Sequence, residues 1–462
     1  KPARPCTRQC WMAATQKQRT RRTSPLVVSD PKEPFLVALN LTQRCNLECA
    51  HCYLDAGTRQ NGDGSELNTD EVKFVIDNIA AMSDETMIVL TGGEPMMRRD
   101  LGELATHASD HGLMVVVGSN GTMLNDARAK ALKEAGVQGI GISIDSLDPA
   151  YHDDFRGQPG AWEKAMAGID ACRNNDLRFQ IHFSVTNDNA DELDDMIAFA
   201  RESGAFVFNV FFLVCTGRGE KVTNISLETY ERVLAQVTEA ARDETGMIVR
   251  AKCAPHFKRM ALELDPSWPV TTAHGYEAGG CLAGTRYARV TPTGEVTPCP
   301  YMENSVGNVR ETSFSELWRD APVFQQLRSP TLQGRCGACE YSKLCGGCRA
   351  RPLARDGNMM GEDFLCGYEP QGGAIIEPLG VEESTMTWTP GAEEWLGRIP
   401  SFVRRFVRVR AESFVRDQGG NEVTAEVMGA LARKKFKGRG KPPSFASDSP
   451  AGSLLKRLGV KQ

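Results

Sequence analysis

Cys45-Asn-Leu-Glu-Cys49-Ala-His-Cys52 is the stretch of this 462-residue chain that decides its fold and its chemistry. The stretch directly follows the apolar run Phe35–Leu41, which is typical of a buried strand. In α/β folds, ligand sites lie in the loops after the strands. Three thiolates within eight residues could hold three corners of an iron–sulfur cubane and leave the fourth iron open. The alternative is a structural zinc, which would need a fourth ligand, with His51 as the local candidate.

Short apolar runs and amphipathic helical segments alternate from Pro34 to Leu213, which predicts six strand–helix repeats. The expected strands are Phe35–Leu41, Met87–Leu90, Leu113–Val117, Gly139–Ile144, Arg178–Val185 and Phe206–Leu213. The expected helices are one that starts at Thr69, then Asp100–His111, Asp126–Ala135, Trp162–Arg173 and Asp191–Glu202. This alternation indicates an α/β fold with a parallel sheet and right-handed crossovers. Periodicity alone does not separate a barrel from an open, doubly wound sheet.

Small polar residues and glycines follow three of these expected strands. Thr91-Gly92-Gly93-Glu94-Pro95 ends the second strand, Ser119-Asn120-Gly121-Thr122 the third, and Ser143-Ile144-Asp145 the fourth. Two glycines let the backbone approach a ligand closely, and Glu94 offers a carboxylate. Taken alone, each run is equally well explained by a turn or a helix cap.

Beyond about residue 250, glycine, proline and cysteine become frequent, which predicts a loop-rich module held by metal rather than by a large apolar core. Seven of the chain's 15 cysteines lie between positions 281 and 366: Cys281, Cys299, Cys336, Cys339, Cys345, Cys348 and Cys366. In a long chain without an apolar export signal, such clustering favours metal ligation over disulfides. A zinc ribbon on Cys336–Cys348 is the alternative, because zinc knuckles share the CxxC…CxxC spacing.

The four motifs of the first half, in this order on successive strands, resemble the radical S-adenosylmethionine (SAM) superfamily. The resemblance implies a partial (β/α)6 TIM-like barrel with a 4Fe–4S cluster on Cys45, Cys49 and Cys52. It implies that SAM binds the open iron and is cleaved reductively to a 5′-deoxyadenosyl radical, which abstracts hydrogen from the substrate. The SAM contacts that it implies are Gly92, Gly93, Glu94, Ser119, Asn120, Ser143 and Asp145, with Glu94 at the amino group of SAM.

The cysteine-rich module resembles the SPASM extension, which binds one or two auxiliary 4Fe–4S clusters. By this resemblance Cys336, Cys339, Cys345 and Cys366 hold one cluster, and Cys281, Cys299 and Cys348 belong to another. The spacing before Cys348 is two residues where the family usually has three, which puts its assignment in question. The fourth ligand of the second cluster stays open between Cys253 and a substrate.

Two further resemblances point to tetrapyrroles. The runs Gly294–Pro300 and Cys336–Arg351 are similar to the radical SAM enzymes of heme and heme d1 biosynthesis, which act on propionate side chains. Separately, Trp395–Arg404, with Val423-Thr424, is similar to the C-terminal domain of light-independent protochlorophyllide reductase subunits. The competing hypothesis is a SPASM-type maturase that modifies a ribosomal peptide or a protein residue.

The expected domains are a polar extension (1–34), a radical SAM core (35–245), an auxiliary-cluster domain (246–370), a linker (371–387), a small helical domain (388–436) and a basic disordered tail (437–462). From Arg398 onward there are 15 Lys/Arg and 5 Asp/Glu, whereas the whole chain has a net charge of −5. No run approaches the ~18 apolar residues of a bilayer span. We expect a cytoplasmic enzyme with a small-molecule substrate, a ferredoxin or flavodoxin as electron donor, and no nucleic-acid partner.

Overall fold

The computed structural model describes residues 33–57, 65–83, 85–221, 225–244, 246–266, 280–376, 386–397, 404, 407–408, 411–412, 414–416 and 418–436. Cys6 and Cys10 of the expected N-terminal extension, much of the expected linker, and the expected tail at 437–462 lie outside these residues. Among the described helices, none is long and apolar enough to cross a membrane.

A nine-stranded sheet forms the centre of the fold, in the order β7-β6-β5-β4-β3-β2-β1-β8-β9. Its strands are β1 (Leu36–Asn40), β2 (Met87–Thr91), β3 (Met114–Ser119), β4 (Gly139–Ser143), β5 (Phe179–Val185), β6 (Val207–Phe212), β7 (Ile248–Lys252), β8 (Tyr287–Val290) and β9 (Val296–Thr297). Every neighbouring pair is parallel except β8 with β9. The two end strands, β7 and β9, do not pair with each other, so the barrel that the sheet forms is partial and stays open between them.

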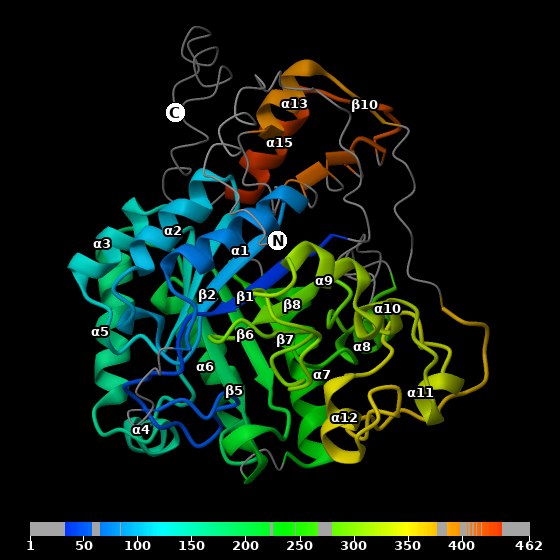
Figure 1. Cartoon of the computed structure of the whole chain (residues 1–462). Helices are drawn as coiled ribbons and strands as arrows, with labels where there is room; N and C mark the ends of the chain where they lie inside the picture. The colour runs from blue at the N-terminus through cyan, green and yellow to red at the C-terminus, as the bar shows by residue number, and fades with distance from the viewer. Residues whose placement is uncertain are drawn as a thin grey trace, which may run out of the picture.

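Helices cover the outer face of this sheet (Figure 1). They are α1 (Thr69–Met82), α2 (Leu101–Asp110), α3 (Asp126–Glu134), α4 (Pro149–Arg156), α5 (Ala161–Asn174), α6 (Leu193–Ser203), α7 (Leu227–Asp243) and α8 (Phe257–Leu264). The start of α1 shows how the local sequence sets such boundaries. The Asn68 side chain accepts a hydrogen bond from the Glu71 amide, and the Glu71 carboxylate accepts one from the Asn68 amide, which together form a capping box.

The two faces of the sheet differ in polarity. Outward side chains, such as Val37, Leu39, Phe179 and Ile181, join the helices in one large apolar core. Because strand side chains alternate, the intervening residues face the inside of the barrel. These inner residues include Ala38, Asn40, Gly141, Ser143, Gln180, His182, Asn209, Phe211, Arg250, Lys252, Tyr287 and Arg289. Met87, Val89, Met114 and Val116 also face inward, so the polar residues of the interior gather mainly on β5 to β8.

The six expected strands and the parallel α/β architecture are confirmed. The structure adds β7 and β8, which lie in the predicted auxiliary domain but pair with β6 and β1. The sheet thus continues past residue 245. Helices α4 and α7 were also not expected. Short β7, with the charged residues Arg250 and Lys252, lacks the continuous apolar run that a strand search looks for.

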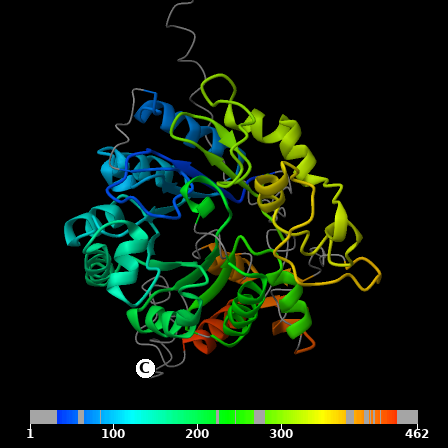
Figure 2. The same ribbon diagram turned by 90° about the horizontal axis from the view of Figure 1, so that it is seen from below.

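The cysteine-rich module lies along the open side of the barrel, where Figure 2 shows its yellow segments beside the curved sheet. It contains α9 (Phe314–Asp320), α10 (Pro322–Arg328), α11 (Gly334–Ala338) and α12 (Ala350–Asp356). Three of its cysteines join a small core with Tyr301, Met302 and Leu327. Helices α9 and α10 contribute Phe314, Trp318 and Phe324 to the large core, whereas the segments that carry the cysteines have mainly this small one.

The C-terminal module is a separate packing unit. Strand β10 (Thr387–Trp388) pairs in parallel with β11 (Glu422–Val423), flanked by α13 (Pro390–Gly397) and α15 (Ala425–Phe436). The Trp388 indole Nε1 donates to the Glu412 Oε1 at 2.8 Å, and the Arg408 guanidinium lies 4.1 Å from the Trp388 ring centroid. Figure 1 shows this module on the side of the barrel where the strands begin, opposite the cysteine loop.

Candidate active site and cysteine clusters

The loop after β1 carries three cysteines whose surroundings suit thiolates. Cys45 and Cys49 are buried and Cys52 is partly buried. The Leu47 amide and the Asn120 Nδ2 donate to the Cys45 Sγ at 3.4 and 3.9 Å, and the Arg156 Nη1 donates to the Cys49 Sγ at 3.8 Å. Burial raises the pKa of Cys45 to about 12, and the hydrogen bond from the Leu47 amide opposes this rise.

The spacing of the thiols argues against zinc. A tetrahedral zinc with Zn–S bonds near 2.3 Å holds its sulfur ligands about 3.8 Å apart. Among the described residues, the ligand atoms of three or more His, Cys, Asp or Glu gather within 4.8 Å of one another only at Asp77, His107 and His111, on the outer helices. The wider spacing of every cysteine group suits a cubane, whose irons stand at separate corners.

His51, the local candidate for a fourth zinc ligand, has a packing role instead. Its ring stacks on Phe155 with the centroids 4.3 Å apart and the planes at 12°. Burial, together with the charge of Arg156, lowers the pKa of His51 to about 3. A neutral, stacked imidazole here fixes α4 against the cysteine loop.

Glycine at positions 92 and 93 lets β2 end directly against the cysteine loop. A Cβ on Gly93 would lie 2.2 Å from the Arg44 carbonyl oxygen, and Gly92 has φ +140° with a Cβ position 2.6 Å from the Thr42 oxygen. The Gly93 and Glu94 amides donate to the Thr42 and Arg44 carbonyls at 2.7 and 2.8 Å. The two glycines therefore allow the backbone of the cysteine loop to approach β2 closely. The hydrogen bonds then fix the loop to the sheet.

Glu94 is fully buried at the carboxyl end of β2. Its carboxylate accepts from the Ser119 hydroxyl at 3.0 Å, the Asn120 amide at 2.9 Å and the Met96 amide at 3.1 Å. Burial raises its pKa, while these hydrogen bonds oppose the rise. The structure therefore brings together Glu94, Ser119 and Asn120 at the same edge of the sheet as Cys45, as the sequence motifs predict.

Asp145, at the end of β4, belongs to a buried ion pair. Its Oδ2 accepts from the Arg156 Nε at 2.6 Å, and its Oδ1 accepts from the Ser184 amide at 2.9 Å. Burial opposes ionisation, but the Arg156 charge lowers the pKa of Asp145. Since Arg156 also donates to the Cys49 sulfur, the pair ties β4 to the cysteine loop. Ser143 lies half-buried just before it, on the inner face of the sheet.

The interior of the barrel near this edge is cationic. His182 on β5 lies over Gly141, where a Cβ would meet the imidazole at 2.3 Å. Burial and the nearby charge of Lys252 lower the pKa of His182 to about 3. Lys252 pairs in register with Phe211, and Arg250 with Asn209. Amides, an imidazole and basic side chains thus line a space suited to an anionic ligand.

Four cysteines of the module surround one cavity. Cys336, Cys339, Cys345 and Cys366 line it, together with Arg259, Arg335 and Tyr368. Burial raises the pKa of Cys366 to about 11, and the Arg349 Nη2 donates to the Cys336 Sγ at 3.8 Å. This set could hold a cubane with a cysteine at every iron.

The remaining predicted ligands of the module form a second group. Cys281, Cys299 and Cys348 pack in one small core, and Cys253 lies in the same core. Burial, followed by the charges of Cys253, Cys281 and Cys348, raises the pKa of Cys299 well above its usual value. The structure therefore places Cys348 with Cys281 and Cys299, in spite of its unusual spacing in the sequence.

Four arginines near the cysteine groups could bind carboxylates by their chemistry, but the structure gives all of them internal contacts. Arg218 donates to the Cys49 carbonyl and to Asp55, and Arg286 donates to the Glu33 carbonyl. Arg349 donates to backbone carbonyls at Met359 and Gly361, and Arg351 pairs with Asp363. These side chains support the cysteine loops rather than the barrel interior.

Sequence reasoning missed three residues of the site: Arg156, Asp363 and Lys252. Arg156 and Asp363 are charged, yet the structure buries both next to cysteines. No spacing rule marks them: Arg156 meets Cys49 across 107 positions, and Asp363 accepts from the Cys348 amide across 15. Lys252 could have been found, since it directly precedes Cys253 at the end of a short β-branched run.

Comparisons with known proteins agree with this site. Residues 39–200 match the radical SAM superfamily, 281–348 an iron–sulfur cluster-binding domain (SPASM), and 388–431 the proto-chlorophyllide reductase 57 kD subunit. An AdoMet-dependent heme synthase of Methanosarcina barkeri is 41% identical over 73% of this chain and 97% of its own length.

More distant similarities extend this comparison. An Fe-coproporphyrin III synthase of the same organism is 31% identical over 74% of this chain and 89% of its own length. Among solved structures, Streptococcus suis SuiB bound to the precursor peptide SuiA aligns with a TM-score of 0.60 at 16% identity, over 73% of this chain and 76% of that one. The last likeness concerns the fold alone.

Proposed function

The chain belongs to the radical SAM/SPASM enzymes, in the family of the AdoMet-dependent heme synthases, and we propose that it converts propionate side chains of an iron porphyrin to vinyl groups. The observation that carries this proposal is the 41% identity to a heme synthase over 97% of that protein's length. A PqqA peptide cyclase of Rhizobium meliloti is 29% identical over 76% of this chain, which is a weaker likeness than that to the heme synthase. We therefore favour a tetrapyrrole over a peptide.

The cofactors of this enzyme class are 4Fe–4S clusters and SAM, and the described side chains fit them. Cys45, Cys49 and Cys52 would hold the cluster that binds SAM, with N–H donors already directed at two of the sulfurs. When bound, these groups supply a 5′-deoxyadenosyl radical that takes a hydrogen atom from the substrate. Glu94, in its buried cradle, would accept a hydrogen bond from the SAM amino group.

The proposed reaction balances at each propionate. Conversion of –CH2–CH2–COO⁻ to –CH=CH2 removes one hydrogen atom, one CO2 and one electron. The hydrogen atom passes to the 5′-deoxyadenosyl group, and the electron needs an acceptor, which the auxiliary clusters would provide. The cysteines of the module would hold these clusters beside the barrel.

The polar interior of the barrel supports a substrate with several carboxylates. Lys252 and Arg250 project from β7 toward the inner face, where His182 and Asn209 lie opposite. A basic side chain that meets a carboxylate in a dry site forms a charge-assisted hydrogen bond of about 1.5–3 kcal/mol. These residues would hold propionates while the face of the macrocycle packs against Phe211.

The redox chemistry places further demands on partners and compartment. Each turnover needs a low-potential electron for SAM cleavage, and we propose a ferredoxin or flavodoxin as its source. Exposed iron–sulfur clusters require a reducing compartment, so we propose the cytoplasm.

An anaerobic turnover assay tests the proposed function. The reconstituted protein is incubated with SAM and dithionite, with and without Fe-coproporphyrin III, and both 5′-deoxyadenosine and porphyrin masses are measured. We expect 5′-deoxyadenosine to form in a porphyrin-dependent way. The neutral porphyrin should lose mass in two successive steps, each equal to one CO2, one abstracted hydrogen atom and one carboxyl proton. Slow SAM cleavage with an unchanged porphyrin would contradict the proposal and redirect the search to peptides.

A further inference from the structure

We propose that Cys253 is the fourth ligand of the auxiliary cluster held by Cys281, Cys299 and Cys348, so that this cluster has no open iron for substrate. The inference rests on the proposed function only because it assumes that Cys281, Cys299 and Cys348 hold a cluster. The sequence leaves two candidates for the fourth ligand of this cluster, Cys253 and a substrate, and the structure favours Cys253.

The backbone at Cys253 is specialised. This residue follows β7 and has φ +58°, one of three non-glycine residues in the described part of the chain with positive φ. A left-handed conformation at a residue with a Cβ is strained and persists only where the surroundings enforce it. The turn reverses the chain between β7 and α8 and directs the Cys253 side chain into the module.

A buried ion pair enforces this turn. The Arg351 Nη2 donates to the Cys253 carbonyl, while its Nη1 donates to the Asp363 Oδ2 at 2.8 Å. The same carboxylate oxygen accepts from the Cys348 amide at 2.7 Å. Arg351 and Asp363 are almost wholly buried, at 1% exposure each. The backbones of Cys253 and Cys348, which lie 95 positions apart in the sequence, are thus both held by the Arg351–Asp363 ion pair.

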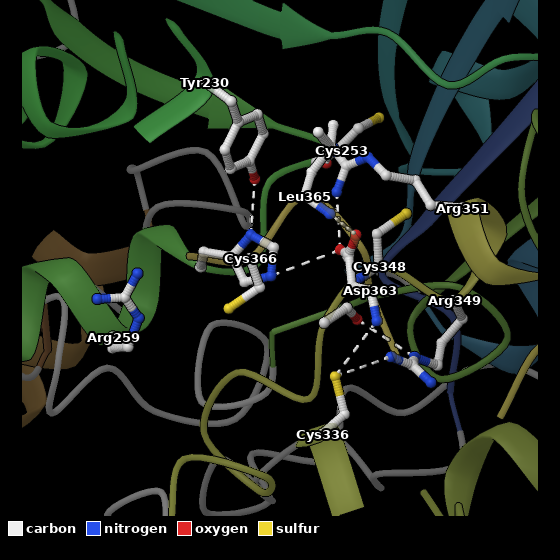
Figure 3. Close-up of polar contacts among 12 residues, drawn as sticks. Tyr230, Cys253, Arg259, Cys336, Cys348, Arg349, Arg351, Asp363, Leu365 and Cys366 are labelled. Carbon is white, nitrogen blue, oxygen red and sulfur yellow. Dashed lines mark hydrogen bonds and ion pairs between the residues drawn. The ribbon is translucent and has the colours of Figure 1, made fainter. Parts of the chain in front are cut away.

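The thiols of this group share one small core. Figure 3 shows the Cys253 and Cys348 sulfurs above and to the right of Asp363, and the Cys336 and Cys366 sulfurs below it. Cys253, Cys281 and Cys299 all pack against the small core that contains Cys348. Tyr301, in the same core, donates a hydrogen bond to the Cys253 sulfur.

The chemistry of this donor set favours a closed cluster. Four cysteines match the four irons of a cubane. The ligand atoms do not gather within the 4.8 Å that marks compact metal groups among the described residues, so a tetrahedral zinc does not fit. A cysteine at every iron would leave no open iron for a carboxylate. Cluster ligation would also stabilise the left-handed turn at Cys253.

The test is the iron content and Mössbauer spectrum of ⁵⁷Fe-reconstituted Cys253→Ala protein, without porphyrin, beside wild type and Cys172→Ala. Cys172 is a buried thiol of α5 in the apolar core, which makes it a matched control. Wild type and the control should contain about twelve irons, as three cubanes require. Cys253→Ala should lose about four of them or show one auxiliary iron with a distinct spectrum. Iron content and spectrum like those of wild type would overturn the assignment.

Two further arms keep the test decisive. If Cys253→Ala fails to fold by circular dichroism, Cys253→Ser takes its place, because a serine oxygen still ligates but shifts the reduction potential of that cluster. An unshifted potential would contradict the proposal. Adding Fe-coproporphyrin III to wild type should leave the auxiliary spectrum unchanged. A substrate-induced change at one auxiliary iron would identify the porphyrin as the fourth ligand. None of these results depends on turnover, so they stand apart from the test of the proposed function.

Discussion

Two regions of the molecule present cysteine thiols as candidate cluster ligands, but in different numbers: the cysteine loop of the barrel and the cysteine groups of the module. The loop offers three thiols, Cys45, Cys49 and Cys52, and the rest of its surroundings come from polar strand ends such as Glu94. Each group in the module gathers four thiols, backed by buried arginine and aspartate. A cubane with three protein ligands can bind and activate a molecule, whereas one with four can only carry electrons.

The two regions also differ in how they are made rigid. The barrel loop is fixed by backbone pairing with Gly93 and Glu94 and by the Asp145–Arg156 pair, all anchored on a large apolar core. The module has a small core and relies on Arg351 and Asp363. Removing metal should therefore leave the barrel folded and loosen the module.

Cys49→Ala should have the largest effect, because it removes one of only three thiols in the loop. We expect 5′-deoxyadenosine to fall to the background of the assay, while the iron of the module remains. The measurement is SAM cleavage under dithionite, together with iron content. Normal 5′-deoxyadenosine formation by this variant would show that the reactive cluster lies elsewhere.

Cys345→Ala should separate the two regions. This change opens the four-thiol set around the module cavity but leaves the barrel loop intact. We expect SAM cleavage to continue while conversion of the porphyrin drops sharply, since the substrate electron loses its acceptor. The ratio of 5′-deoxyadenosine to vinyl product measures this uncoupling, and an unchanged ratio would count against an electron-carrying module.

Lys252→Gln should produce a moderate effect at the substrate. Loss of a charge-assisted hydrogen bond of about 1.5–3 kcal/mol corresponds to at least a tenfold rise in KM for Fe-coproporphyrin III. SAM cleavage without porphyrin should not change. The matched control is Lys130→Gln on the exposed face of α3. Equal KM values for both variants would remove Lys252 from the substrate site.

Truncation after Ile376 should have the smallest effect. The C-terminal module lies where the strands begin, away from the cysteine loop (Figure 1). We expect kcat/KM with dithionite to stay within about twofold of the full chain. A large rise in KM would instead give this module a direct role in porphyrin binding.

The sequence predicts the barrel well because its strands and cysteine spacing are local features. The division of the module's cysteines into two ligand groups comes from the resemblance to the SPASM extension. Six strands and the strand-end motifs are evident from neighbouring residues. Long-range partners are not. The Arg156 contact with Cys49 joins residues 107 positions apart, and Arg351 meets the Cys253 carbonyl across 98 positions. Strand β7 was also missed, because its inner face carries Arg250 and Lys252 in place of apolar residues.

The central claim is that the three-thiol loop generates a radical that takes hydrogen from a porphyrin propionate. Fe-coproporphyrin III with deuterium on the propionate carbons next to the pyrrole rings tests this claim most directly. We predict that one molecule of singly deuterated 5′-deoxyadenosine forms for each vinyl group. Unlabelled 5′-deoxyadenosine beside a vinyl product would contradict the account, because the hydrogen would then have come from another position or another molecule.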